Sequence, residues 1–246
     1  FHKGQETHFH VNQRMGGGTW VYLGTFEFDK GNSINNSVVL TNRSAHKGIV
    51  TADAVRFGGG MGNIVRGTSV SGLPRFLEGA RYYTQWAGAP RNVVSTSNGS
   101  NDYNDDINSR SLMTNWLVGG SSYLPHVKDG KMVPIELSLA VHSDAGVKSD
   151  GSLVGTLGIC TTQQGNSTLG DGLSRQASKT LAQQLVANAK KDIEKSLNIS
   201  WQTRSVWDRN YSETRLPAIP SAILETLSHQ NFPDIKLGQD PNFKFT

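Results

Sequence analysis

The hydrophobic pattern of this 246-residue chain changes its period once, near residue 70, and this change constrains the fold more than any other feature. Up to residue 66 the apolar residues form short, β-branched or aromatic runs separated by Gly, Asn and Ser, which is typical of strands. From residue 76 onward, strand-like runs alternate with helical patterns, which indicates an α/β layer fold. Residues 67–75 between them have the composition of a linker.

The first part, residues 1–66, predicts an antiparallel β-sandwich module. Its strand-like runs are "ETHFHVNQ", "TWVYLGTFEF", "NSVVLTN" and "IVTADAVRFG". A sandwich of this kind usually needs about seven strands. We therefore expect a module that is truncated at its start.

The second part, residues 76–246, predicts a sheet flanked by helices. A helix is expected over 104–118, ended by the glycine pair that follows it. A longer amphipathic helix is expected over 171–198, because an apolar residue recurs every four positions and Asp171 can serve as its N-cap. Apolar runs at 133–142 and 152–162, and a shorter one at 222–224, predict the strands.

Two of these strands are followed by residues that can do chemistry. His142 follows the alternating run "VPIELSLAV", and Glu225 follows "SAIL". If the two strands are parallel neighbours, both side chains lie at the same edge of the sheet, where ligands bind in open α/β folds. Zinc hydrolases combine His and carboxylate ligands with a Glu that moves a proton. A structural histidine that ends a strand is the alternative interpretation of His142.

Other candidate sites are weaker. Cys160 lies inside an apolar strand and is expected to be a buried, inert thiol. The acidic residues Asp102, Asp105 and Asp106 lack the spacing of a calcium loop and are better explained as a helix N-terminus. The segment 205–217, "SVWDRNYSETRLP", fits a polar ligand cleft and an exposed loop equally well.

Composition argues against several classes of protein and of binding site. A net charge of +4 without a dense Lys/Arg block argues against a nucleic-acid partner. No apolar run has the length of a membrane span. The single cysteine rules out an internal disulfide and a Cys-rich structural zinc site.

The order of "DDINSRSLMTN", "LSLAVHSDA" and "RLPAIPSAILETLSHQNFPD" resembles the later half of the zinc-dependent N-acetylmuramoyl-L-alanine amidases. Arg110 and Asn115 match the family's helix motif. His142 matches its strand histidine, which the resemblance implies is a zinc ligand. Glu225, followed by Thr226, matches the glutamate that acts as catalytic acid/base.

Two further residues have counterparts near the substrate in that family. Asp144 stands where the family usually has Asn, and Arg215 precedes the last strand. The resemblance implies that both contact substrate. The family's other two zinc ligands, a His and a Glu, have no match here, so we expect them upstream of Phe1.

The first part of the chain resembles the golvesin C-terminal-like domain, on "GTWVYLGTFEF" and "GIVTADAVRFGG". The combination is similar to exported proteins of the Bacteroidetes type, some of which carry the label xanthan lyase. It implies a periplasmic, cell-surface or extracellular protein.

Together the resemblances imply an α/β amidase-like domain that hydrolyses an amide bond of peptidoglycan with Zn²⁺. This activity belongs to the full-length protein, because one histidine cannot hold zinc alone. The alternative is a non-catalytic, cell-surface glycan-binding protein with a degenerate amidase fold, whose exposed aromatic side chains stack on sugars.

Overall fold

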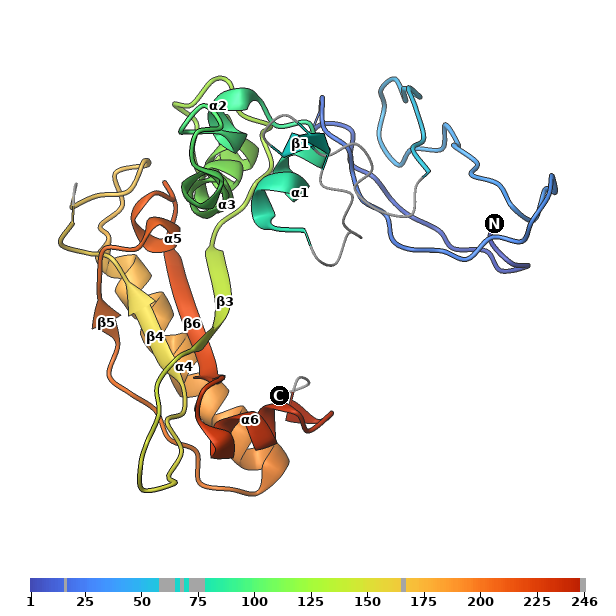
Figure 1. Cartoon of the computed structure of the whole chain (residues 1–246). Coiled ribbons are helices and arrows are strands. Elements are labelled where there is room, and N and C mark those ends of the chain that lie inside the picture. Colours follow the sequence, from blue (N-terminus) through green and yellow to red (C-terminus); the bar gives the residue numbers. More distant parts are fainter. Residues whose placement is uncertain (16, 58–64, 67–68, 71–77, 165–166, 244–246) are drawn as a thin grey trace.

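The computed structural model describes residues 1–15, 17–57, 65–66, 69–70, 78–164 and 167–243 (Figure 1). The described part of the predicted linker 67–75 is β2 (Ser69–Val70), which pairs antiparallel with β1 (Val65–Arg66). The rest of that linker lies outside the described residues. The predicted division of the chain into a module at 1–66, a linker at 67–75 and a domain at 76–246 therefore stays a prediction.

The α/β part is built on a four-stranded sheet in the order β3-β6-β4-β5 (Figure 1). Its strands are β3 (Ser138–Asp144), β4 (Leu157–Cys160), β5 (Trp207–Asp208) and β6 (Ser221–Ser228). The β3–β6 and β4–β5 pairs are parallel, as expected for an α/β fold. The β4–β6 pair is antiparallel, so the sheet is mixed rather than wholly parallel.

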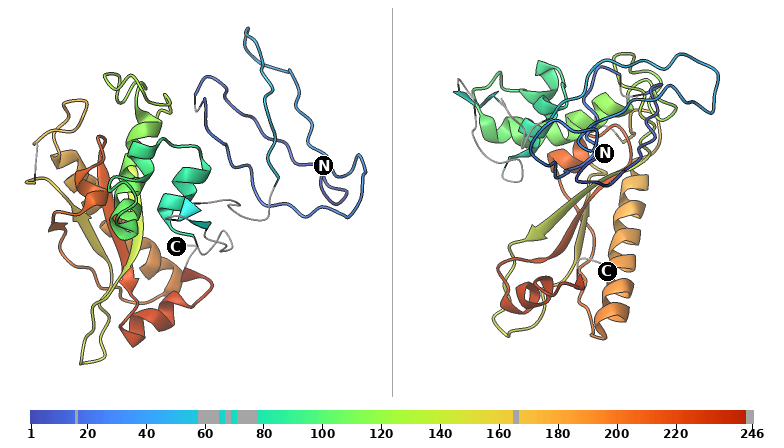
Figure 2. Two further views of the ribbon diagram at one scale, coloured as in Figure 1. Left: turned by 45° about the horizontal axis from the view of Figure 1, so that its top comes forward. Right: turned by 90° about the vertical axis from the view of Figure 1, so that its right-hand side faces the viewer.

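The long helix α4 (Gln176–Leu197) lies along one face of this sheet (Figure 2, right). Ala182 of the helix packs against Cys160 and Ala222 of the strands, and all three are fully buried. Gly158 allows the close approach, because a Cβ there would lie 2.9 Å from Val186 and 3.0 Å from the Ala182 carbonyl.

The predicted start of α4 is wrong. Asp171 accepts a hydrogen bond from the Leu173 N–H in a turn before the helix, and the N-cap position belongs to Arg175. Within the helix the predicted apolar repeat faces the core, since Leu181 and Leu185 pack against the buried cluster of Ala182, whereas Leu173 precedes the helix and is exposed. The carboxylate forms a local turn here instead of capping the helix.

Three helices form a separate layer beyond one end of the sheet (Figure 1). They are α1 (Ala80–Trp86), α2 (Arg91–Val94) and α3 (Asp102–Val118). The short helix α5 (Ser212–Arg215) packs between α3 and the sheet, and α6 (Phe232–Gly238) follows β6. None of the helices in the described part is long and apolar enough to cross a membrane.

The prediction of α3 is confirmed in position and ending, with Gly119 at its C-cap. Its buried positions, however, are mostly polar. Asp105 and Ser109 are fully buried and Ser111 nearly so, whereas Val118 is the buried apolar position and the apolar Leu112 and Trp116 are half-buried. Hydrogen bonds to α1, α2 and α5 therefore take the place of a hydrophobic stripe.

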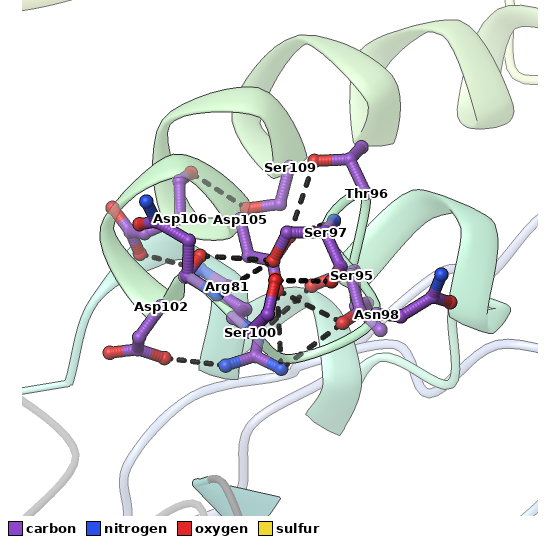
Figure 3. A network of polar contacts seen from close by, with 12 residues as sticks. Arg81, Ser95, Thr96, Ser97, Asn98, Ser100, Asp102, Asp105, Asp106 and Ser109 are labelled. Carbon is purple, nitrogen blue, oxygen red and sulfur yellow. Dashed lines mark hydrogen bonds and ion pairs between the residues drawn. The ribbon is translucent and has the colours of Figure 1, made fainter.

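A buried polar network joins α3 to the two preceding helices (Figure 3). The Arg81 guanidinium donates to the Asp102 carboxylate (2.5 Å) and to the Val94 carbonyl (2.9 Å). Asp105 accepts from the Ser97 N–H (2.6 Å) and from the hydroxyls of neighbouring residues in the same turn, Ser95 and Thr96. These acidic residues thus lie at a helix N-terminus, as predicted. Asp102 binds the Arg81 guanidinium, and Asp105 binds the turn over residues 95–97.

The predicted β-sandwich is not confirmed. No strand is assigned within residues 1–15 and 17–57, and none of these residues is buried. A single bridge joins His2 to Gln5. Without a second layer, apolar strands have no face on which to bury their side chains. The segment contacts α1 instead, where the Trp20 N–H donates to the Ala87 carbonyl (3.1 Å).

The buried Asp105 carboxylate gives a first prediction. Burial would raise its pKa, but hydrogen bonds led by the Ser97 N–H outweigh burial and lower the pKa. A lowered folded pKa stabilises the fold above the unfolded value of about 4, and this stabilisation is lost as the pH falls through the folded pKa. We expect Asp105→Asn to reduce the free energy of unfolding by about 1 to 3 kcal/mol at neutral pH.

Urea unfolding at several pH values measures this effect. The difference between wild type and Asp105→Asn should shrink below about pH 4. Asp129→Asn, which removes an exposed carboxylate, is the matched control and should unfold like wild type. A difference that stays constant with pH would contradict an ionised Asp105 in the fold.

Candidate functional site

His142 and Glu225 lie side by side on adjacent parallel strands. They are register partners in the β3–β6 pair, and the His142 Nδ1 atom lies 4.0 Å from a Glu225 carboxylate oxygen. Register partners of neighbouring strands point to the same face of a sheet. The Thr226 hydroxyl donates to the His142 carbonyl (3.0 Å) and ties the strands together at this point. The expectation that the two strands are neighbours is confirmed.

A second glutamate, Glu213 of α5, contacts the other ring nitrogen of His142. Its two carboxylate oxygens lie 3.0 and 3.2 Å from Nε2. The Arg110 guanidinium of α3 donates to the same carboxylate at 3.1 Å and to Asp106 at 2.9 Å. His142 therefore has a carboxylate on each side of its ring.

Hydrogen bonds from two directions fix the backbone of α5. From α3, the Ser111 hydroxyl donates to the Ser212 carbonyl, and the Asn115 amide donates to the Leu216 carbonyl, both at 2.9 Å. From the other side, the Arg175 guanidinium donates to the Arg215 carbonyl at 2.9 Å. Arg110 and Asn115, the residues that match the amidase helix, thus both act on this short helix.

The pKa values of the two glutamates are shifted in opposite directions. Burial raises the pKa of Glu225 and outweighs the nearby His142. Burial would also raise the pKa of Glu213, but the His142 hydrogen bond and the charges of His142 and Arg110 lower it. The hydrogen bond with Glu213 raises the pKa of His142. The site therefore pairs a carboxylate whose pKa is raised with one whose pKa is lowered.

One oxygen of the Glu225 carboxylate is buried and has no hydrogen-bond partner among the described residues. Only 13% of this side chain is exposed. An unpartnered buried oxygen is costly, and it marks a position where a proton, a water molecule or a ligand is accommodated.

The tentative substrate residues lie in different surroundings. Asp144, at the end of β3, forms an ion pair with Arg204 at 2.6 Å. Burial would raise its pKa, but the Arg204 and Ala145 hydrogen bonds lower it. The Arg215 Nε atom is buried without a hydrogen-bond partner in the described part of the chain. No contact of its side chain with His142 or Glu225 is found there.

The described residues do not by themselves form a complete metal site. Within the described residues, no group of three or more His, Cys, Asp and Glu side chains is arranged to hold a metal ion. Glu213 and Glu225 approach different nitrogens of the His142 ring, so the three side chains do not converge on one point. His142 can supply one ligand from this set.

Glu213 lies in the segment 205–217, which fits a polar ligand cleft or an exposed loop, but the sequence does not single it out as a site residue. Its signal was weak, because a glutamate in a four-residue helix carries no motif. The sequence also gives no sign that Arg110 pairs with Glu213, since the two residues are 103 positions apart.

Comparison with known proteins gives one family match. The family model of the golvesin C-terminal domain matches residues 1–59, which confirms the resemblance seen in the first part of the chain. This match ends before the α/β part that carries His142 and Glu225. No curated protein matches the sequence.

Two solved structures of N-acetylmuramoyl-L-alanine amidases align with the chain. The enzyme from Clostridium difficile 630 has 11% identity and a TM-score of 0.35, over 63% of this chain and 70% of its own. The catalytic domain of CwlV from Bacillus (Paenibacillus) polymyxa var. colistinus has 12% identity and a TM-score of 0.30, over 55% and 73%. Both scores are below 0.5, so neither likeness establishes a common fold.

The free cysteine gives a second prediction. Cys160 is fully buried on β4, and burial raises its pKa to about 11, so it is neither ionised nor reachable as a nucleophile. We expect a thiol reagent such as dithionitrobenzoate to leave the native protein unmodified at about pH 8, below the thiol's ordinary pKa. After denaturation it should titrate the single thiol of the chain. Fast labelling of the native protein would contradict the burial of Cys160.

Proposed function

We propose that this chain is part of an exported zinc amidohydrolase that cleaves an amide bond of peptidoglycan, as N-acetylmuramoyl-L-alanine amidases do. The observation that carries the proposal is the in-register pair of His142 and Glu225, with a buried, unpartnered oxygen on Glu225. A histidine beside a glutamate with a raised pKa is the combination that hydrolytic proton transfer needs.

The residues present fit zinc in part. The His142 imidazole is a suitable ligand, and Oε1 of the Glu225 carboxylate lies 4.0 Å from its Nδ1 atom, while Oε2 is the buried oxygen without a partner among the described residues. The remaining ligands, predicted to lie upstream of Phe1, stay a prediction. Bound zinc would supply a Lewis acid and lower the pKa of water to about 7.

Glu225 would move the proton. Its carboxylate accepts a proton from the attacking water, and the resulting acid donates that proton to the leaving amine. Burial raises the pKa of Glu225, which makes its carboxylate a stronger base toward the attacking water. Asp144 and Arg215 are proposed to contact the substrate, and the Asp144–Arg204 pair would present a fixed carboxylate to it.

A second candidate is the non-catalytic glycan-binding protein. The exposed aromatic side chains favour it, because Trp207 is 37% exposed and the guanidinium groups of Arg204 and Arg209 lie 5.8 and 5.5 Å from its ring centroid. Tyr211, Trp20 and Tyr22 are also exposed. Such rings can stack on sugars, but surface aromatics of this kind are common in loops.

Substitution of Glu225 tests the catalytic proposal. In the protein expressed from its full reading frame, Glu225→Gln should lower kcat on peptidoglycan fragments by about 100-fold or more, because the amide cannot take a proton. Zinc content, measured by elemental mass spectrometry, should stay at the wild-type level.

The matched control is Glu136→Gln, which makes the same change at an exposed position before β3 and should leave kcat unchanged. Wild-type turnover in Glu225→Gln would remove Glu225 from the mechanism. Absence of both zinc and turnover in the wild type, together with saturable glycan binding that is lost in Trp207→Ala, would favour the second candidate.

A further inference from the structure

The contact between Glu213 and His142 fixes where the imidazole carries its hydrogen. Both Glu213 oxygens lie within hydrogen-bond range of Nε2, at 3.0 and 3.2 Å. The same carboxylate already accepts a hydrogen bond from the Arg110 guanidinium and turns both oxygens to the ring, so it is the acceptor and Nε2 is the donor. In the neutral ring, the lone pair is then on Nδ1. That atom faces Glu225 at 4.0 Å, too far for a hydrogen bond.

We propose that Glu213 is a positioning residue, which holds His142 in the Nε2–H tautomer with Nδ1 free to bind a metal ion on the Glu225 side. The inference rests on the proposed function. Metal-binding histidines almost always donate their other N–H to a carboxylate or carbonyl, which sets the ring orientation and raises its basicity. Glu213 occupies that position relative to His142.

Glu213 is itself held by a chain of charged groups. Arg110 donates to Glu213 at 3.1 Å and to Asp106 at 2.9 Å, and the Arg81 backbone N–H donates to Asp106 at 2.8 Å. Asp106 lies beside the Arg81 network at the start of α3 (Figure 3). The position of the carboxylate next to His142 therefore depends on both α1 and α3.

The residue after Glu213 attaches this part of α5 to the sheet. Thr214 is fully buried, and its hydroxyl lies 2.7 Å from the Thr161 hydroxyl next to β4. The Ser221 hydroxyl at the start of β6 donates to the Thr214 carbonyl at 3.2 Å. Glu213 is thus attached to the same sheet that carries His142, and only 13% of its side chain is exposed.

A tautomer measurement and a metal-binding measurement test the inference together. Long-range ¹H–¹⁵N NMR on the metal-free protein from its full reading frame, at about pH 9 to keep the ring neutral, reports which nitrogen carries hydrogen. The His142 signals are assigned by their loss in His142→Ala. Zinc affinity is measured by competition with a chelator for the wild type, Glu213→Gln and the control Glu136→Gln.

The expected result is an Nε2–H tautomer in the wild type that is lost in Glu213→Gln, with zinc binding weakened about 10- to 100-fold. Glu136→Gln should match the wild type in both measurements. An Nδ1–H tautomer in the wild type overturns the inference, and this measurement decides even if Glu213→Gln does not fold. Equal zinc affinity of the wild type and a folded Glu213→Gln also overturns it but leaves the proposed function in place.

If the proposed function is wrong, the two measurements give a different set of results. A wild type that binds no zinc, yet shows an Nε2–H tautomer that Glu213→Gln abolishes, overturns the zinc hydrolase and upholds the positioning role of Glu213.

Discussion

The in-register parallel pairing of β3 and β6 is the constraint on which the rest of the site depends. It places His142 opposite Glu225 without any contribution from loops. A register shift of one residue would turn one of the two side chains to the opposite face, where α4 packs. Immediately after His142 the ladder is irregular, so that Asp144 pairs with Ser228 and an extra residue lies on β6. The irregularity directs the end of β3 toward Arg204.

Around this pair the molecule uses polar contacts where a small domain usually uses apolar ones. Arg81 and Asp105 at the centre of the polar network are buried, and every link from the network to Glu213 is a charge-assisted hydrogen bond. Such networks specify geometry strictly, because any unpaired member is costly in a low-dielectric interior. A similar arrangement holds the exit of β6, where buried Asp234 accepts from the N–H groups of Val154 and Gly155 at 2.9 and 2.8 Å.

The sequence predicts the parts of this fold that are periodic. The body of α4, the end of α3 at Gly119 and the strand that carries His142 follow from spacing, since hydrophobic periodicity reports directly on local structure. Glu213 and the direction of β4 could not be predicted in this way. Both depend on contacts between residues far apart in the chain, and a four-residue helix or strand has too few positions to show a period.

The N-terminal segment shows that a strand-like sequence pattern does not by itself determine strand formation. Its runs have the composition of strands and match a known domain family over residues 1–59, yet no strand is formed within residues 1–15 and 17–57. Strand propensity is a property of a half-buried, paired surface rather than of the chain itself. His142 and Glu225 meet because their strands are paired and one face is covered by α4. Where strand pairing is missing, as around Trp20 and Tyr22, even large aromatic side chains remain exposed.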